Sequence, residues 1–147
     1  MAPRLEPLFQ SRRGPLARFA LLRLREHGED PRNWRPNILA FAAAPEKRIG
    51  LVRLANWFSQ GRGVVTVCNL VVGDLMSDDL ELAERKQRIQ RVIDAEEIVV
   101  FPEVDAVNDI VEGLVNVSQA NGMAGMASNT VLLGWPESTA RRADFLR

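Results

Sequence analysis

The fold is decided in the middle of the chain by a run typical of buried β-strands, Val64-Val65-Thr66-Val67-Cys68-Asn69-Leu70-Val71-Val72. Three shorter apolar runs accompany it, at residues 38–42, 98–101 and 130–133. Strands that are apolar along their whole length are usually covered by helices on both faces, as they are in parallel sheets. The four runs therefore predict a mostly parallel sheet.

Helical spacing of apolar residues separates the four runs. We expect a first helix between Pro45 and Gly61, a second after Asp78, and a third from about Asp105 to the glycine-containing segment 121–125. Apolar residues that recur at intervals of three and four give a helix one face toward the core. The residues expected on these inward faces are Leu51, Leu54, Ala55 and Phe58, then Leu82, Ile89, Val92 and Ile93, then Val107, Ile110, Val111 and Leu114. The order β-α-β-α-β-α-β predicts a three-layer α/β sandwich.

Residues 1–31 are expected to be a leader outside the α/β domain, which we place at residues 32–147. The leader contains a short amphipathic stretch at 16–24, and residues 138–146 resemble the start of another helix. Up to Arg35 the chain has eight arginines and four acidic residues, a balance of 8 − 4 = +4. Such a basic segment occurs near anionic lipid or nucleic acid, and also as the solvated face of an ordinary helix. Charge alone leaves these interpretations open.

The composition excludes several classes of protein. Lysine and arginine number 19, as do aspartate and glutamate, so the whole chain has no charge bias toward nucleic acid. Cys68 is the single cysteine, which rules out an internal disulfide. No secretory signal is recognisable, and no apolar run approaches the ~20 residues that cross a bilayer. The three tryptophans do not alternate with basic residues, so no base-stacking surface is expected.

Residues suited to catalysis are few. Acid–base and nucleophilic sites need particular partners within hydrogen-bond reach. The chain has one histidine, His27, in a polar segment, one cysteine, Cys68, inside a predicted strand, and no tyrosine. No cluster of cysteine and histidine has metal-ligand spacing. We therefore expect no enzyme activity, no metal site and no cofactor.

Carboxylates do lie near the ends of two predicted strands. Asp74 follows the second strand, and Glu103 and Asp105 follow the third. Doubly wound folds bind ligands at the carboxyl edge of the sheet. The simpler interpretation, which we favour, is that Asp78 and Asp105 cap the helices that follow them.

Three glycines keep a second function open. Gly122, Gly125 and Gly134 approximate the glycine spacing of universal-stress-type nucleotide-binding domains. Glycine-rich loops bind phosphate because their backbone N–H groups approach it closely. Here the glycines precede a strand instead of opening a helix, and Gly134 is followed by Trp135 and Pro136. Nucleotide binding through Gly122 and Gly125 is therefore the alternative prediction.

Two longer stretches carry a resemblance to a known family. The first is Asn33-Trp34-Arg35-Pro36-Asn37-Ile38-Leu39, and the second, at 118–136, ends in Asn129-Thr130-Val131-Leu132-Leu133-Gly134-Trp135-Pro136. Together, over residues 17–136, they resemble the cytosolic C-terminal domain of cation–chloride cotransporters, which belong to the amino acid–polyamine–organocation superfamily of permeases. Met123-Ala124 departs from the more usual Leu-Gly of that family. The signature residues, to which we assign structural roles, are Asn33, Trp34, Arg35, Pro36, Asn129, Thr130, Gly134, Trp135 and Pro136.

The resemblance implies a universal-stress-like α/β fold on the cytosolic side of the cell membrane. It implies a regulatory and dimer-forming role, with the protein's own transmembrane transport domain as the main partner. The basic leader then reads as a connecting helix at the membrane surface. The α/β domain corresponds to the first half of the family's larger cytosolic region. The residues also suggest local roles: Arg35-Pro36 directs the chain into the first strand, and Asn129 sets the turn before the last one.

Overall fold

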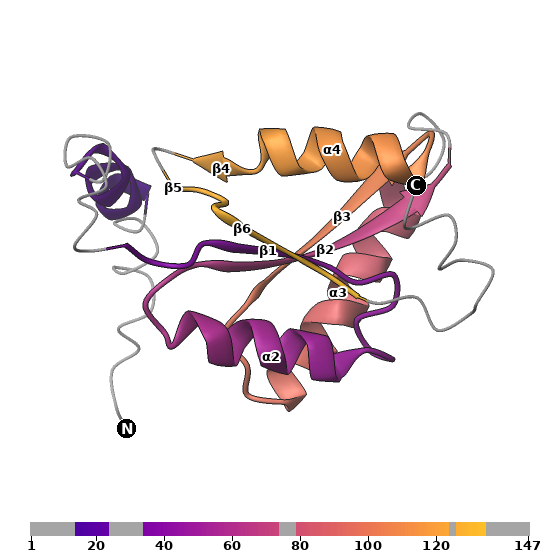
Figure 1. Ribbon diagram of the computed structural model, residues 1–147, viewed down its shortest axis with the longest axis horizontal. Helices are drawn as coiled ribbons and strands as arrows, with labels where there is room; N and C mark the ends of the chain where they lie inside the picture. The colour runs from indigo at the N-terminus through magenta and orange to yellow at the C-terminus, as the bar shows by residue number, and fades with distance from the viewer. Residues whose placement is uncertain (1–13, 24–33, 74–78, 124–125, 135–147) are drawn as a thin grey trace, which may run out of the picture. The chain divides into compact units, whose positions relative to one another are not determined.

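A computed structural model describes residues 14–23, 34–73, 79–123 and 126–134 (Figure 1). The chain divides into two compact units, which are described separately. One unit comprises Met1–Trp34 with Gly122–Ala127, and the other comprises Arg35–Asn121 with Ser128–Arg147.

The larger unit is built on a parallel sheet of four strands. These are β1 (Ile38–Phe41), β2 (Val65–Val72), β3 (Phe101–Val107) and β6 (Thr130–Leu133). Their order across the sheet is β3-β2-β1-β6, so β3 and β6 form its edges. Ile38 of β1 pairs with Val65 on one side and Thr130 on the other. The prediction of a parallel sheet is confirmed.

Helices cover both faces of this sheet. The helices are α2 (Ile49–Ser59), α3 (Asp79–Ala95) and α4 (Ile110–Ala120). In Figure 1, α2 and α3 lie on one side of the sheet and α4 lies on the other. The predicted three-layer α/β sandwich is therefore confirmed.

The sheet separates two clusters of buried side chains. Between the sheet and the pair α2 and α3 lies the larger cluster, formed by Ile38, Ala40, Ala42, Val52, Ala55, Val65, Val67, Ile89, Ile93 and Val100. On the opposite face, Leu39, Phe41 and Cys68 are buried, with Leu114 and Val117 of α4 packed against them. Strands β1 and β2 contribute to both clusters because successive side chains of a strand point to opposite faces.

The smaller unit contains a helix at residues 14–23 and a two-stranded antiparallel sheet. The strands are β4 (Gly122–Met123) and β5 (Met126–Ala127), which sequence analysis did not predict. The helix falls within the predicted leader, and its Arg23 guanidinium lies 5.7 Å from the centroid of the Phe19 ring. Among the described residues, no helix is long and apolar enough to cross a membrane.

The predicted position of the third strand was wrong. Residues 98–101 were expected to form it, whereas β3 begins at Phe101 and continues to Val107. Ile98 and Val100 pack into the core before the strand begins, which explains their apolar character. The strand itself alternates polar and apolar residues because it lies at the edge of the sheet, where burial is incomplete.

This displacement also overturns the predicted cap at Asp105. Asp105 lies inside β3, and α4 begins at Ile110. Asp109 is the N-cap, and its Oδ1 accepts hydrogen bonds from the N–H groups of Val111 at 2.8 Å and Glu112 at 2.9 Å. Of the predicted inward face of this helix, Val107 lies in β3 instead, and Ile110 and Val111 are exposed. The other predicted cap, Asp78, lies outside the described residues.

The inward face of α2 also differs from the prediction. Val52, Ala55 and Ser59 are buried, whereas Leu54 and Phe58 are about half exposed. Apolar residues occupy much of the helix circumference, so their spacing alone leaves its rotation ambiguous. The small side chains of Ala55 and Ser59 allow α2 to lie close to the sheet. For α3 the prediction was better, since Ile89 and Ile93 are buried.

Candidate functional site

The two signature stretches meet at one end of the sheet. The side-chain Oδ1 of Asn129 accepts a hydrogen bond from the Asn37 N–H at 3.0 Å. Its Nδ2 donates to the Arg35 carbonyl at 2.7 Å, across a sequence separation of 94 residues. In return, the Asn37 carbonyl accepts from the N–H groups of Asn129 at 3.0 Å and Thr130 at 3.2 Å. We call Arg35, Asn37, Asn129 and Thr130 the asparagine junction.

Asn37 extends the junction to a third strand. Its side chain is buried, and its Oδ1 accepts a hydrogen bond from the Val64 N–H at 3.2 Å. The asparagine junction thus fixes the chain just before β1, β2 and β6. Asn37 belongs to the first signature stretch, but sequence analysis assigned it no role. Its position between Pro36 and a buried strand was the feature that could have identified it.

Asn129 therefore bonds to distant backbone. Sequence analysis predicted that it sets a local turn, but Arg35 and Asn37 are its main partners. The local contact is a hydrogen bond of 3.1 Å from Thr130 Oγ1 to Asn129 Oδ1. Both polar atoms of the Asn129 amide, Oδ1 and Nδ2, are used in hydrogen bonds to the protein. The asparagine junction is therefore suited to holding strands and not to binding a ligand.

Pro36 contributes through close packing next to the junction. Pro36 is buried, and a Cβ placed on Gly63 would collide with the Pro36 carbonyl. Glycine at position 63 thus allows the segment before β2 to approach the signature stretch. Asn33, Trp135 and Pro136 of the signature lie outside the described residues, and Trp34 is 56 % exposed in the smaller unit.

Doubly wound folds bind ligands at the carboxyl edge of the sheet, and the space beside Asn69 at this edge is nearly filled. The Nδ2 of Asn69, a buried residue, donates to the Ala42 carbonyl at 3.0 Å and also to the Ala43 carbonyl. The cavity beside Asn69 has a volume of about 20 Å³ and is also lined by Arg85 and Arg88. That volume suits a single water molecule and is far too small for a nucleotide.

The structure describes two of the three glycines considered for phosphate binding. Gly122 lies in β4 with φ of 140°, in the smaller unit, and the strand leads toward β5 and not into a helix. Gly125 lies outside the described residues. Gly134 follows β6, where a Cβ would collide with the Arg48 guanidinium. The Arg48 side chain therefore occupies the space beside Gly134.

A wider pocket lies at the turn between β3 and α4. It has a volume of about 280 Å³, and its polar lining includes Asp105, Asn108, Asp109, Glu112 and Asn116. The Asp109 carboxylate is engaged in capping α4. No group of three or more His, Cys, Asp or Glu side chains within the described ranges is placed to hold a metal ion. The pocket therefore has acidic lining without a metal-ligand arrangement.

The carboxylates expected at strand ends have local partners. Glu103 lies within β3 and accepts a hydrogen bond from Lys86 Nζ of α3 at 2.7 Å. Asp105 Oδ2 accepts from the Cys68 thiol at 3.4 Å. Asp74 and His27 lie outside the described residues. Neither Glu103 nor Asp105 is paired with a group that would make it a general acid or base.

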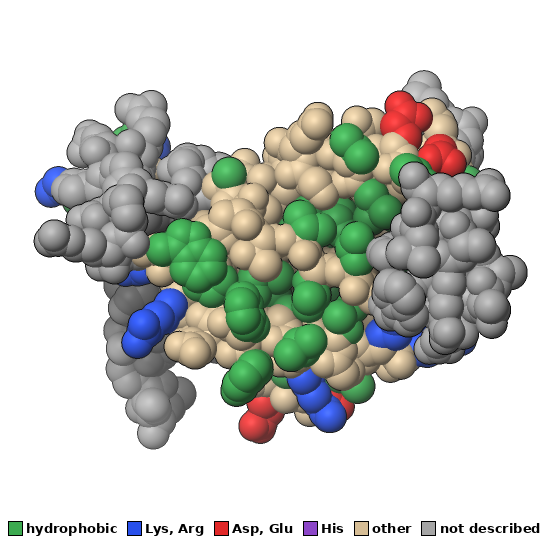
Figure 2. Space-filling model, viewed as in Figure 1, with side chains coloured by type: hydrophobic (Ala, Val, Ile, Leu, Met, Phe, Trp, Pro, Cys, Tyr) green, Lys and Arg blue, Asp and Glu red, His purple; other side chains and the backbone are tan. Residues whose placement is uncertain are grey.

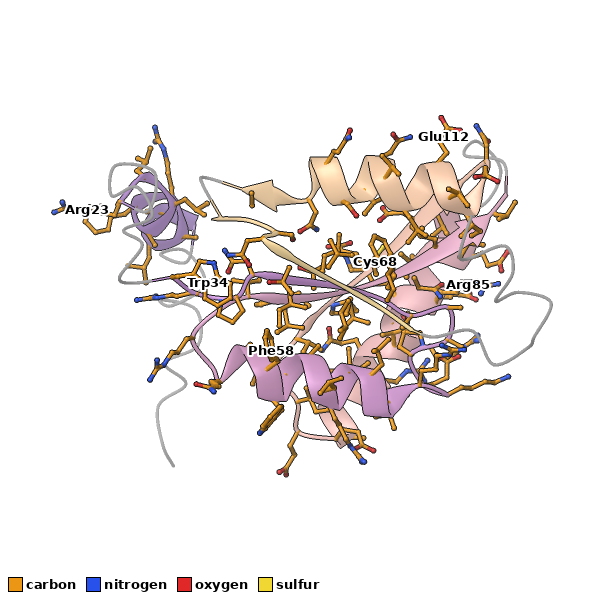
Figure 3. All side chains as sticks on the ribbon, in the orientation of Figure 1. Arg23, Trp34, Phe58, Cys68, Arg85 and Glu112 are labelled. Carbon is orange, nitrogen blue, oxygen red and sulfur yellow. The ribbon has the colours of Figure 1, made fainter. Side chains whose placement is uncertain are left out.

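Cys68 is the one thiol of the chain, and it is 1 % exposed (Figure 3). Burial is the main cause that raises the pKa of this thiol, and the neighbouring carboxylates of Asp105 and Glu103 raise it further. A nucleophilic cysteine needs the opposite environment, since the thiolate is the reactive form. Cys68 therefore acts as a small apolar residue of the core.

No protein-family model matches this chain.

Proposed function

We propose that this chain is a non-catalytic regulatory and dimerisation domain on the cytosolic side of a secondary transporter that resembles the cation–chloride cotransporters. The observation that carries the proposal is the asparagine junction. The two stretches on which the resemblance rests lie about 100 residues apart in sequence, yet they join through the side chains of Asn37 and Asn129. Their residues act as one structural unit, as a family signature with a scaffolding role should.

The chemistry of the described residues favours a scaffold over a catalyst. Cys68 is buried and held as the neutral thiol, and the strand-end carboxylates Glu103 and Asp105 are engaged by Lys86 and Cys68. The cavity beside Asn69 holds no more than a water molecule, and the lining of the wider pocket at the end of β3 includes no cysteine, histidine or lysine. These features supply no arrangement of nucleophile, base and substrate space.

The helix at residues 14–23 supports the proposed connection to a membrane domain. Leu16, Phe19 and Leu22 of this helix are exposed, and Arg18 and Arg23 lie among them. A basic segment beside a membrane span suits the cytosolic side, where positive residues accumulate. We propose that this helix connects to the transport domain and contacts the membrane surface.

The reading frame upstream of Met1 tests the transporter assignment. We expect it to encode about a dozen apolar segments of ~20 residues each, the length that crosses a bilayer. A stop codon directly before Met1, with no membrane protein encoded upstream, contradicts the proposal. This test is independent of whether the isolated chain forms dimers.

Calorimetric titration with ATP tests the scaffold role. We expect no heat of binding at millimolar nucleotide, because the cavity beside Asn69 is far too small, the wider pocket at the end of β3 has an acidic lining that repels phosphate, and Gly122 does not open a helix. Saturable binding of ATP would instead support the nucleotide-binding alternative.

A further inference from the structure

Within the ranges that the structure describes, the β6 edge of the sheet is open and apolar. Thr130–Leu133 has no charged residue and no proline, and Val131 and Leu133 are 47 % and 41 % exposed. A flat apolar edge strand is a template for pairing with another strand, and monomeric proteins usually protect such an edge with charge, proline or a covering element. Among the described strands, the main neighbour of β6 is β1.

The free backbone groups of β6 can be assigned from its pairing with β1. Thr130 donates its N–H to the Asn37 carbonyl, in the direction of β1. Successive N–H groups of a strand point to opposite sides, so the Leu132 N–H also points toward β1. The N–H groups of Val131 and Leu133 therefore point outward, to the open side of the sheet.

Helix α2 extends the apolar surface beside this edge. Arg53 Nε donates to Glu96 at 3.1 Å, which marks the flank of α2 that faces α3. Leu54 and Phe58 lie on the other flank, toward β6, and Phe58 projects from this side of α2 in Figure 3. Leu51 and Leu132 pack in the same cluster, which places the first turn of α2 beside β6.

Apolar side chains border the β6 edge from both faces of the sheet: Val131 and Leu133 point to the face that α4 covers, like their partners Leu39 and Phe41, whereas Leu54 and Phe58 project from α2 on the other face. Hydrophobic side chains gather over β6 and α2 in Figure 2. We call the following residues the edge patch, with their exposed fractions: Leu54 46 %, Phe58 50 %, Val131 47 % and Leu133 41 %. With full residue areas on the order of 150–200 Å², the edge patch presents roughly 300 Å² of apolar surface.

This area is part of what a homodimer requires. A stable interface buries about 800 Å² on each partner, and about 65 % of a homodimer interface is apolar. The edge patch supplies more than half of that apolar share, and pairing of the β6 backbones adds polar contact area. An isologous contact uses the same patch on both subunits, so no other surface is needed.

We propose that a second copy of this chain binds at the β6 edge, with the two β6 strands antiparallel across a two-fold axis at Leu132. In this register Val131 lies opposite Leu133 of the partner, and the outward backbone groups of both residues pair. A two-fold axis perpendicular to the sheet at Leu132 keeps each side chain on its own face and places 131 opposite 133 and 132 opposite 132. The two sheets become one sheet of eight strands, with the α2 helices on the same side. The inference names the dimer surface of the proposed function and rests on it.

Sedimentation equilibrium of the full chain tests this surface with a double charge. The chain has a mass of 16.4 kDa, and we expect about twice this mass at high concentration. Val131→Lys with Leu133→Lys places like charges in register across the axis, and we expect the dimer dissociation constant to rise at least about 100-fold. The matched control is Val72→Lys with Val99→Lys, two valines that are 60 % and 78 % exposed away from β6. It should leave the dissociation constant unchanged.

Hydrogen exchange of the unmodified chain provides a second readout that does not depend on how the variants fold. The Val131 and Leu133 amides should become protected as the concentration rises, while the Leu132 amide is protected at every concentration. A dimer that persists in the charged variant, or edge amides that exchange equally fast at all concentrations, overturns the inference and leaves dimerisation itself intact. A chain that stays monomeric at millimolar concentration overturns both the inference and the dimer-forming part of the proposed function. A monomer that binds an added strand-forming peptide at β6 overturns the second copy as occupant.

Discussion

The β3 edge of the sheet carries proline and charge, whereas the β6 edge carries neither. In β3, Pro102 removes a backbone donor, Glu103 is bound by Lys86, and Asp105 accepts from Cys68. Helices α3 and α4 both pack against this strand. In β6, all four residues are uncharged, and Val131 and Leu133 are partly exposed. The sheet therefore has one edge protected against strand pairing and one edge that favours it.

The two edges are also held in place by different means. Strand β3 is held by helices through side-chain packing, as at Val107 and Gly113. Strand β6 is held at its start by hydrogen bonds of the asparagine junction. In the described part of the chain, an edge strand is thus fixed by hydrogen bonds at its start while its Val131 and Leu133 side chains stay partly exposed. Substitutions that weaken either the helix packing on β3 or the hydrogen bonds at the start of β6, but not both, test this difference.

Packing at the β3 edge should give the largest effect. Gly113 of α4 is buried, and a Cβ there would lie 2.6 Å from Val107 Cγ1 and 2.9 Å from Val107 Cβ. We expect Gly113→Ala to destabilise the fold by about 2–3 kcal/mol, because α4 must move away from β3. Urea unfolding monitored by circular dichroism measures this loss.

Gly50→Ala is the matched control for Gly113→Ala. Gly50 lies in α2, and a Cβ there has no atom within 4 Å. The substitution should leave stability unchanged or raise it by up to about 1 kcal/mol through helix propensity. Equal losses for both variants would show that close packing at Val107 does not secure the β3 edge.

Removal of the Asn129 side chain should have the next largest effect and should act on the β6 edge. Asn129→Ala deprives the Asn37 N–H and the Arg35 carbonyl of their partners. Because the site is partly exposed, we expect a loss of about 2 kcal/mol and faster hydrogen exchange at β6 than at β3. Asn116→Ala on the exposed side of α4 is the control and should cost less than about 0.5 kcal/mol. Uniform exchange at both edges would contradict a separate attachment of β6.

The Cys68 thiol should make stability depend on alkaline pH. Its pKa is raised in the folded protein above the ordinary value of 9.0, so the folded state keeps a proton that the unfolded state loses. The contribution is complete below pH 9 and is lost as the pH rises above it, by about 1.4 kcal/mol for each pH unit. Measurements of unfolding free energy between pH 8 and pH 10 give this slope.

Cys68→Ser isolates the thiol's share of that slope. Serine keeps a donor for Asp105 but does not titrate in this range. The variant should show a smaller decrease in stability from pH 9 to pH 10 than the unmodified protein. Identical pH profiles would show that the pKa of the thiol is the same in the folded and unfolded states. They would also argue against the hydrogen bond from Cys68 to Asp105 that joins β2 to β3.

The surface ion pair of the β3 edge should have the smallest effect on stability. Lys86 and Glu103 side chains are 46 % and 47 % exposed. We expect Lys86→Ala to change the unfolding free energy by less than about 0.5 kcal/mol, because solvent and salt screen an exposed pair. The variant should still be no more prone to self-association than the parent, since Pro102 and the covering helices remain. Self-association through β3 would show that the ion pair is the main protection of that edge.

Much of the fold was predictable from the sequence, but the orientation of several elements was not. Strands β1, β2 and β6 were predicted close to their observed positions because each is a compact apolar run. Strand β3 was displaced in the prediction because Ile98 and Val100 are buried outside a strand. The flank of α2 with Leu54 and Phe58 was predicted to face inward, although it forms part of the edge patch. Apolar spacing does not distinguish a core from an interface.

The candidate site was predictable only in part. The signature residues Arg35, Pro36, Asn129 and Thr130 were identified from the sequence, but the role of Asn37 was not. The hydrogen bonds between Asn129 and the first signature stretch join residues 92 and 94 positions apart. No local pattern encodes such a pairing, because side-chain partners are set by which strands become neighbours.

The sequence by itself determined the fold class, because the apolar runs and the helical spacing of apolar residues indicate which part of each segment is buried. It also determined that the chain has one cysteine, one histidine and no tyrosine, which follows from composition. The tertiary structure alone decided the strand order that places β3 and β6 at the edges. It also decided the rotation of α2 and the meeting of Asn37 with Asn129. These depend on contacts between distant segments, whose geometry follows from packing all the elements together and not from any one of them.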